Sequence, residues 1–348
     1  MTNDRIRIGF VGAGTNTRLR HIPGLKAIDG VELVSVCNRS RESSQRVADE
    51  FGIPKVYDQW TDLVEADDTD AICIGTWPYL HCSATLASLA AGKHVLTEAR
   101  MAMNATEARA MLEASRRRPD LVTQIVPSPL TLKFDRTIRE MIAAGYLGDI
   151  LAVEVRGPGN VFVDKDSRMH WRQDRDLSGY SILNMGIWYE ALIRWVGPAV
   201  SVMAMTSVNV PRRLDAEGAL QAVTVPDHAE VLCRMAGGAQ AHLSFSAVTG
   251  LARVPEAWLF GSEGTLHLDG TSGNMVLRGG KPGDKALAEI EIPAGKQGGW
   301  RVEEEFINAI RGQEPVTHTN FGDGVKYMEF TEAVTRSAES GKAVALPL

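Results

Sequence analysis

The stretch that decides the fold is Ile6-Arg7-Ile8-Gly9-Phe10-Val11, an apolar strand that continues directly into Gly12-Ala13-Gly14-Thr15-Asn16-Thr17. A strand that ends in Gly-x-Gly before a helical segment is typical of the start of a dinucleotide-binding βαβ unit. The first glycine permits a tight turn, and the second lets backbone N–H groups approach a pyrophosphate at the N-terminus of the next helix. The third position of the usual pattern holds Thr17 instead of glycine, so the rest of the chain must separate a cofactor loop from an ordinary turn.

A second apolar run, Val31–Cys37, predicts a neighbouring parallel strand, and it ends at Asn38-Arg39-Ser40-Arg41. In a unit that prefers NAD, this strand end usually carries Asp or Glu, which binds the ribose 2′-hydroxyl. Asn38 leaves no charge to repel a 2′-phosphate, and Arg39 and Arg41 offer guanidinium groups to bind one. The sequence therefore favours NADP over NAD; the alternative is that both arginines are merely solvated at the start of a helix.

The composition is that of a globular enzyme of 348 residues with 44% hydrophobic residues and a net charge of -6. The charge argues against nucleic acid as a partner. The four cysteines show no CxxC pair and no metal-ligand spacing, so we expect buried free thiols and no metal site. No signal-peptide core and no apolar stretch of membrane-spanning length is found, and the expected location is the cytoplasm, away from membranes.

Strands and helices alternate with short loops up to about residue 122, which predicts a doubly wound parallel sheet. After Pro127 and Pro129 the pattern changes to period-two runs joined by turns at Gly237-Gly238 and Ser262-Glu263-Gly264. These runs predict a large open, mainly antiparallel sheet, closed by helices near the C-terminus. The predicted fold is α/β: a Rossmann domain over residues 1–124 and a substrate-binding and oligomerisation α+β domain over residues 125–348.

Several motifs, spread in order along the whole chain, resemble those of the glucose-fructose oxidoreductase and inositol dehydrogenase family, often written Gfo/Idh/MocA. They are Val11-Gly12-Ala13-Gly14, Thr76-Trp77-Pro78-Tyr79-Leu80-His81, Ala91-Gly92-Lys93-His94-Val95-Leu96-Thr97-Glu98, Gly145-Tyr146-Leu147-Gly148, Gly261-Ser262-Glu263-Gly264-Thr265-Leu266 and Ser337-Ala338-Glu339-Ser340-Gly341-Lys342. The resemblance implies hydride transfer between a nicotinamide cofactor and a hydroxyl carbon of a sugar or cyclitol.

The resemblance also assigns the cofactor contacts. It places the pyrophosphate on Gly12, Ala13, Gly14, Thr15, Asn16 and Thr17, and the adenosine ribose at Asn38, Arg39 and Arg41. Thr76, Trp77 and His81 are expected beside the nicotinamide, and Glu98 and Ala99 at the same half of the cofactor. For His81 an alternative is a helix residue without any ligand.

Three positions that handle protons in the family are altered here. Family members usually have Glu-Lys-Pro where this chain has Glu98-Ala99-Arg100, and an Asp and a His where this chain has Asn184 and Trp188. Alanine carries no proton, asparagine does not titrate, and a guanidinium is no base near neutral pH. Hydride transfer from an alcohol nevertheless requires a proton acceptor.

Other side chains in the same region are candidates for that role: Tyr180, Tyr189, His170 and Lys133, with Glu190 as a further possibility. A tyrosine beside a cation such as Arg172 is favoured to ionise. The expected substrate contacts are Trp171, Arg172, Asn184 and Trp188, because indole faces stack on sugar rings and amides bind hydroxyl groups. For each candidate the alternative is a purely structural position.

Three functions are consistent with these replacements. The first is a nicotinamide-dependent sugar or polyol oxidoreductase whose acid/base group has moved. The second is a lyase, epimerase or glycoside-cleaving enzyme that oxidises its substrate transiently with tightly bound cofactor. The third is a nucleotide-binding protein without catalysis. The resemblance further implies a homodimer or homotetramer formed through the C-terminal sheet, for which the alternating apolar residues from Ala239 to Phe245 are suited.

Overall fold

The computed structural model describes residues 5–159, 161–252, 254–270 and 274–348. The chain forms two compact units, one of Met1–Pro127 with Arg301–Val325 and the other of Ser128–Trp300 with Lys326–Leu348. The sequence placed a single boundary after residue 124, so residues 301–325 were assigned to the wrong unit.

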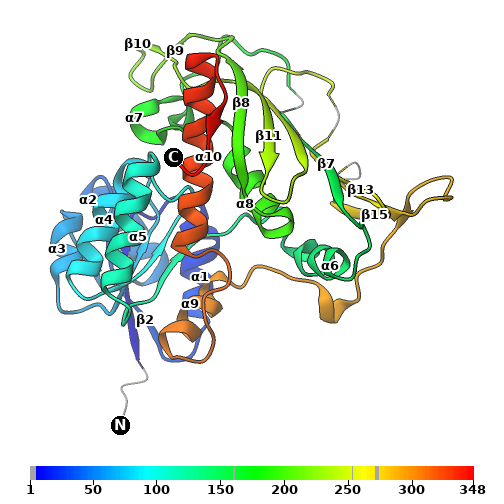
Figure 1. Ribbon diagram of the computed structural model, residues 1–348. Helices are drawn as coiled ribbons and strands as arrows, with labels where there is room; N and C mark the ends of the chain where they lie inside the picture. The colour runs from blue at the N-terminus through cyan, green and yellow to red at the C-terminus, as the bar shows by residue number, and fades with distance from the viewer. Residues whose placement is uncertain (1–4, 160, 253, 271–273) are drawn as a thin grey trace. The chain divides into compact units, whose positions relative to one another are not determined.

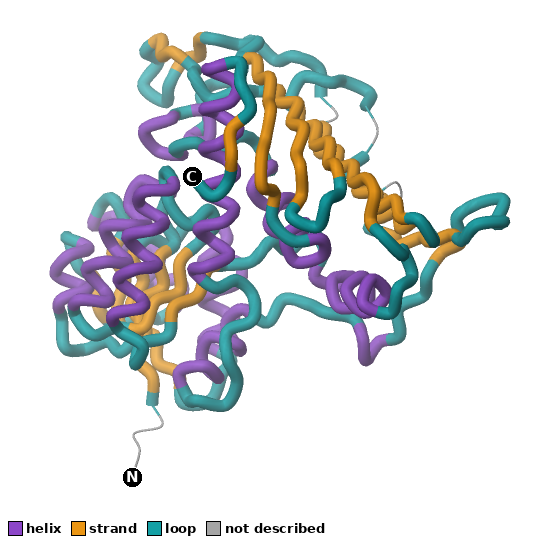
Figure 2. Tube along the Cα trace, viewed as in Figure 1, coloured by secondary structure: helices purple, strands orange, loops and turns teal. Residues whose placement is uncertain are grey.

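The first unit is a six-stranded parallel sheet in the order β3-β2-β1-β4-β5-β6 with helices between the strands (Figures 1 and 2). This order is that of a doubly wound dinucleotide-binding sheet, with a change of direction between β1 and β4. The elements are β1 (Ile6–Val11), α1 (Ile22–Lys26), β2 (Val31–Cys37), α2 (Arg41–Phe51), β3 (Lys55–Val56), α3 (Trp60–Glu65), β4 (Ala71–Ile74), α4 (Pro78–Ala90), β5 (His94–Thr97), α5 (Ala105–Arg117), β6 (Thr123–Ile125) and α9 (Val302–Ile310).

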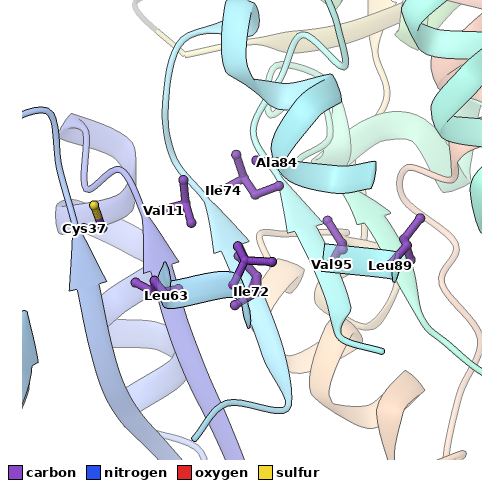
Figure 3. Packing of buried hydrophobic residues seen from close by; sticks show 9 residues of the cluster. Val11, Cys37, Leu63, Ile72, Ile74, Ala84, Leu89 and Val95 are labelled. Atoms are coloured by element: carbon purple, nitrogen blue, oxygen red, sulfur yellow. The ribbon is translucent and has the colours of Figure 1, made fainter. Parts of the chain in front are cut away.

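Apolar side chains from the central strands and from α3 and α4 form one core cluster of this unit (Figure 3). Ile72, Ile74 and Val95 are fully buried, and Leu63 of α3 packs against them. Burying one such side chain stabilises the fold by about 1.5–3 kcal/mol. Near-continuous apolar strands are expected where a parallel sheet is covered on both faces, and this packing holds the carboxyl ends of β1, β4 and β5 at one edge.

The second unit is built on a nine-stranded sheet in the order β16-β15-β14-β13-β7-β12-β11-β8-β17. Neighbouring strands are antiparallel except for β7 and β12, which are parallel. The strands are β7 (Ile150–Pro158), β8 (Ala199–Ser207), β11 (His228–Met235), β12 (Gln240–Ser246), β13 (Glu256–Gly261), β14 (Thr265–Asp269), β15 (Val276–Gly280), β16 (Ala288–Glu289) and β17 (Val344–Ala345), and a separate pair is formed by β9 (Arg212–Leu214) and β10 (Leu220–Ala222). The mixed, mainly antiparallel sheet confirms the fold class predicted from the sequence.

Helices of the second unit are α6 (Leu132–Ala143), α7 (Arg175–Ser178), α8 (Met185–Val196) and the part of α10 (Phe321–Ser340) that follows Val325. Tyr189 of α8 stacks on Phe330 of α10, and the Ser337 hydroxyl accepts a hydrogen bond from the Ala204 amide of β8. Ala204 is buried, whereas its neighbours Met203 and Met205 are 51% and 78% exposed. The helices therefore cover one face of the sheet at β8.

The apolar residues of β12 do not form an exposed face. Ala241, Leu243 and Phe245 are all buried, which corrects the prediction that these alternating residues line an oligomer interface. Exposed apolar residues of this sheet include Met203 and Met205 on β8 and Leu232 on β11, which is 59% exposed.

All four cysteines are buried and free, as predicted. Among the helices that the structure describes, none is both long enough and apolar enough to span a bilayer.

Candidate functional site

The loop after β1 brings two backbone segments unusually close together. Gly12 has a φ of +80°, a conformation that glycine adopts without strain. A Cβ at Gly12 would lie 2.5 Å from the Thr76 side chain of the β4 loop, and a Cβ at Gly14 would lie 3.0 Å from the Gly75 carbonyl oxygen. The two glycines therefore permit the close approach of the β1 and β4 loops that a pyrophosphate-binding turn requires.

Thr17, at the position of the usual third glycine, is buried and begins a π-helical turn, Thr17–His21, ahead of α1. The regular helix expected directly after the loop is therefore replaced by a wider turn. Because this turn carries His21 into the interior, the residue becomes part of the site in a way that the sequence did not indicate.

A cavity of about 930 Å³ opens beside this loop, at the carboxyl ends of β1, β2 and β4. Its size falls within the range of small-molecule and cofactor sites. Seven of the predicted cofactor residues line it: Gly12, Ala13, Gly14, Asn38, Arg39, Thr76 and Trp77. The other seven do not contribute to its wall as the structure describes it: Thr15, Asn16, Thr17, Arg41, His81, Glu98 and Ala99.

Asn38 organises the cavity wall through its amide group. Its Oδ1 accepts a hydrogen bond from the Ala13 N–H at 2.7 Å, and its Nδ2 donates to the Ser43 carbonyl oxygen at 3.0 Å. Both ends of the amide are therefore occupied by backbone groups. Asn38 holds the glycine loop against the start of α2, and the predicted hydrogen bond to the adenosine ribose is not available to this conformer.

The two arginines after β2 differ in their surroundings. Arg41 forms an ion pair with Asp58 at 2.9 Å and lies outside the cavity wall, which corrects its prediction as a cofactor ligand. Arg39 lines the cavity and has no ion-pair or hydrogen-bond partner among the described residues. Ser43 and Arg46 of α2 also line it. Ser43 and Arg46 are three residues apart on α2, which places both on one side of the helix.

His81 is fully buried and joins the loops after β4 and β5. Its Nδ1 lies 2.8 Å from the Arg100 carbonyl oxygen and its Nε2 lies 3.0 Å from the Thr76 carbonyl oxygen. Burial lowers the pKa of the ring. The predicted contact with nicotinamide is therefore replaced by a structural role behind the cavity, the alternative that the sequence had left open.

Glu98 follows β5 and is held by polar groups from two other segments. Its Oε1 accepts hydrogen bonds from Asn16 Nδ2 at 2.5 Å and from His21 Nε2 at 3.0 Å. Burial raises the pKa of this carboxyl, but the hydrogen bond and charge of His21 outweigh that effect and lower it. Glu98 is therefore ionised, and the missed residue His21 is its direct partner.

In the second unit, two predicted site residues lie in the interior. Tyr189 is 1% exposed, its hydroxyl oxygen accepts a hydrogen bond from the Ala199 N–H at 2.9 Å, and burial raises the pKa of its phenol. Trp188 is fully buried and presents no face to a ligand. The predictions of Tyr189 as a proton acceptor and of Trp188 as a sugar-stacking residue are therefore wrong.

Glu190, the further candidate for proton transfer, also makes structural contacts with other residues. Its carboxylate forms an ion pair with Arg194 at 2.6 Å and accepts a hydrogen bond from the Ser128 N–H at 3.0 Å. These partners hold the buried carboxylate in one position. Glu190 therefore ties α8 to the segment before α6.

The remaining candidates of the second unit are more accessible. His170 and Arg172 are exposed, and Trp171, Tyr180 and Asn184 are half-buried. The Arg172 guanidinium lies 4.2 Å from the centre of a Trp171 ring, and that of Arg175 lies 5.4 Å from the Tyr180 ring. The cation beside a candidate tyrosine is therefore Arg175, where the sequence suggested Arg172.

Lys133 and Asn184 complete the candidates. Lys133 is exposed on α6, with its ammonium 5.4 Å from the Phe134 ring centre. Asn184 precedes α8, and a Cβ on Gly157 would lie 2.9 Å from its Oδ1, so the glycine allows the amide to approach β7. No group of three or more His, Cys, Asp or Glu suited to a metal ion occurs in the part of the chain that the structure describes.

Comparison with protein families gives two matches that follow the two halves of the chain. A model described as an oxidoreductase family with an NAD-binding Rossmann fold matches residues 6–125, and the C-terminal domain model of the same family matches residues 136–267. The chain belongs to the Gfo/Idh/MocA oxidoreductase family. It is a nicotinamide-dependent oxidoreductase, and its first unit is the NAD-binding domain.

Individual relatives of this Gfo/Idh/MocA protein are distant. A 1,5-anhydro-D-fructose reductase from Ensifer adhaerens is 36% identical over 149 residues, 43% of this chain and 44% of the relative. A trans-1,2-dihydrobenzene-1,2-diol dehydrogenase from Bos taurus is 25% identical over 78% of this chain and 72% of its own length. A levoglucosan dehydrogenase solved with NADH and L-sorbose has a TM-score of 0.85 at 20% identity, with 99% of each chain covered, and shares the fold.

The cavity of the first unit fits the nicotinamide dinucleotide that the family uses. A Cβ at Gly12 would collide with Thr76, so only glycine lets the loop pack this closely against the β4 loop beside the cavity, as in a pyrophosphate-binding turn. The residues that would hold the cofactor are Gly12, Ala13 and Gly14 at the pyrophosphate and Arg39 at the adenosine end. When bound, the cofactor supplies a carbon that accepts or releases a hydride.

Proposed function

We propose that this oxidoreductase interconverts a hydroxyl and a keto group on a sugar, cyclitol or related polyol, with NADP as its preferred cofactor. The substrate class is supported by the relatives, whose names describe enzymes of an anhydro-fructose, a cyclic diol and a levoglucosan. It is also supported by the half-buried indole of Trp171 and amide of Asn184, groups that stack on sugar rings and bind hydroxyl groups.

The observation that carries the NADP preference is the position of Arg39. Arg39 lines the cavity at the end of β2 and has no ion-pair partner among the described residues, and Asn38 stands where NAD-binding units usually carry a carboxylate. A free guanidinium binds a phosphate through charge-assisted hydrogen bonds worth about 1.5–3 kcal/mol. This corresponds to about 10- to 100-fold in affinity for the 2′-phosphate.

Arg39→Ala tests this assignment, with Arg41→Ala as the matched control because Arg41 is paired with Asp58 and does not line the cavity. We expect Arg39→Ala to lower kcat/KM for NADP by about 10- to 100-fold and to change that for NAD by less than about threefold. Arg41→Ala should leave both values near wild type. Equal kcat/KM for NAD and NADP in the wild type would refute the preference.

For the proton acceptor we propose Tyr180. It is half-buried whereas Tyr189 is buried, and the Arg175 guanidinium lies 5.4 Å from the centre of its ring. His170 is less suited as a base, because its Nδ1 accepts a hydrogen bond from the Arg172 N–H at 3.2 Å. In the neutral ring Nε2 then carries the proton, and His170 can donate a hydrogen bond to substrate. Lys133 remains the other exposed candidate.

We also propose that the enzyme forms homo-oligomers through the open face of the nine-stranded sheet. Met203, Met205 and Leu232 expose apolar side chains on adjacent strands β8 and β11 of that face. Exposed apolar groups gathered on one surface are typical of protein contacts. Sedimentation of the wild type and of a Met205→Glu, Leu232→Glu variant checks this: an oligomer that the variant abolishes supports the interface, and a monomeric wild type overturns it.

A further inference from the structure

One loop of the second unit is held by a hairpin that follows it much later in the chain. The loop, called here the 164–173 segment, carries His170, Trp171 and Arg172, which the sequence singled out as site residues. The hairpin consists of β9 and β10, which pair with each other outside the nine-stranded sheet. Hydrogen bonds join the two at three places.

Arg213 of β9 holds the start of the 164–173 segment. Its Nη1 donates to the Ser167 carbonyl oxygen at 2.8 Å and to the Ser167 hydroxyl at 2.5 Å, and its Nη2 donates to the Asp164 carbonyl oxygen at 2.7 Å. Arg213 is 8% exposed, whereas Leu214 beside it is 46% exposed. A guanidinium is a planar fork with N–H groups in fixed directions, so one side chain holds both carbonyl groups in a set geometry.

The turn that Arg213 holds is also closed on itself. Oδ1 of Asp164 accepts hydrogen bonds from the N–H groups of Asp166 at 2.9 Å and Ser167 at 3.0 Å. These two hydrogen bonds lower the pKa of the Asp164 carboxyl. Arg213 therefore fixes a folded turn and not an extended strand of loop.

The hairpin holds the middle of the segment as well. The Met169 N–H donates to the Leu214 carbonyl oxygen at 2.7 Å, and Nη1 of Arg168 donates to the Ala216 carbonyl oxygen at 2.6 Å. The segment thus runs along β9 from its first residue to Met169.

The hairpin itself is a firm support. Val210, Val223 and Val225, which flank its two strands, are 5–6% exposed. The Asp215 carboxylate closes its turn by accepting the Ala219 N–H at 2.7 Å. A loop bound to this hairpin is therefore tied to a packed part of the unit.

The 3₁₀ turn that carries Trp171 begins directly after Met169. His170 caps this turn: its Nδ1 accepts the Arg172 N–H at 3.2 Å, and its own N–H donates to Gln173 Oε1 at 2.9 Å. Because the residue before His170 is bound to β9, the hairpin fixes the chain up to the turn.

We propose that Arg213 is a positioning residue for substrate binding, which holds the 164–173 segment on β9 and thereby places the Trp171 indole against the ring of a sugar or cyclic polyol. Arg213 acts through Trp171. The inference rests on the proposed function, in which Trp171 contacts the substrate.

The proposed proton acceptor is held by other contacts. Arg175, whose guanidinium lies beside the Tyr180 ring, donates to the Thr224 carbonyl oxygen at 3.0 Å. Loss of Arg213 therefore removes a binding contact and leaves the chemistry in place. Such a loss raises KM with kcat unchanged.

Steady-state kinetics of Arg213→Met and Arg212→Met with NADP and each of D-glucose, myo-inositol and trans-cyclohexane-1,2-diol that the wild type oxidises test the role. Arg212 is the matched control, since it is the exposed neighbour on β9 and has no hydrogen bond or ion pair within the described part of the chain. We expect Arg213→Met to raise KM for the polyol at least about tenfold, with kcat and KM for NADP within about threefold of wild type. Arg213→Lys should lie between, because an ammonium does not reproduce the fork.

Limited trypsin digestion tests the hold on the loop without any substrate. Lys165 and Arg168 are exposed, but cleavage after them requires local opening of the segment. We expect cleavage at these two residues, followed by mass spectrometry, to be at least about tenfold faster in Arg213→Met than in wild type. Arg212→Met should be cleaved at the wild-type rate.

Equal cleavage of Arg213→Met and wild type overturns the inference. So does faster cleavage with an unchanged KM for the polyol, because the segment then places no substrate contact, and so does an equal rise of KM for NADP, because that indicates a general loss of structure. If the wild type oxidises none of the three polyols, it is the proposed function that fails, and the cleavage rates still decide whether Arg213 holds the segment.

Discussion

The ionisation of His21 makes the stability of the protein depend on pH. Its pKa is raised from 6.5 to about 9 in the fold, because the hydrogen bonds from the ring to Glu303 and Glu98 outweigh the burial that opposes its charge. One pKa unit corresponds to about 1.4 kcal/mol. The charged ring therefore contributes about 3 kcal/mol to the free energy of unfolding below pH 6.5, and this contribution is lost as the pH rises through about 9.

Urea unfolding of wild type and His21→Gln at pH values on both sides of this window measures the effect. Glutamine fills part of the imidazole space but carries no charge, so the difference between the two proteins isolates the titration of His21 from that of all other groups. The free energy of unfolding of the wild type minus that of His21→Gln is expected to be about 3 kcal/mol larger at pH 6.5 than above pH 9. A difference that is the same at all pH values would refute the reasoning, because it would mean that His21 is uncharged in the folded protein.

Three further predictions concern individual residues. Gly12→Ala should weaken binding of both NAD and NADP by at least about tenfold, measured by fluorescence titration, because its Cβ would lie 2.5 Å from Thr76; unchanged binding would remove the glycine loop from the site. Lys93→Met should lower the free energy of unfolding by about 1–3 kcal/mol, since the Lys93 ammonium donates to two backbone carbonyl groups of the loop before β4, and a melting temperature equal to wild type would contradict this. Tyr180→Phe should lower kcat by about 10²- to 10⁴-fold. Tyr189→Phe should lower the free energy of unfolding by about 1 kcal/mol and leave kcat within about threefold of wild type. A larger fall of kcat in Tyr189→Phe than in Tyr180→Phe, measured in steady-state assays, would exchange their roles.

The parallel sheet and the glycine turn could be predicted from the sequence because both depend on local patterns. Apolar strands such as Val31–Cys37 alternate with helices at short spacing, and Gly12 stands where the backbone needs a positive φ. Each feature is decided within about ten residues of chain, so no knowledge of distant contacts is required.

The parts that could not be predicted depend on contacts between distant residues. Glu303 reaches His21 across 282 positions of sequence, and nothing local marks it as a partner. The helix α8 is apolar on nearly all sides, so its sequence did not reveal that Trp188 and Tyr189 face the interior. Arg39 and Arg41 look equivalent in the sequence, and only the position of Asp58 separates them.

The formation of reduced cofactor shows directly whether the protein is an NADP-linked oxidoreductase of sugars or cyclic polyols. The wild-type protein is mixed with NADP or NAD and a panel of anhydro sugars, cyclitols and cyclic diols, and the absorbance of the reduced nicotinamide is followed. We expect net reduction of cofactor with at least one of these compounds and a kcat/KM at least about tenfold higher with NADP than with NAD. Conversion of a compound to product without any net change in cofactor would contradict the claim and favour transient oxidation by a tightly bound cofactor.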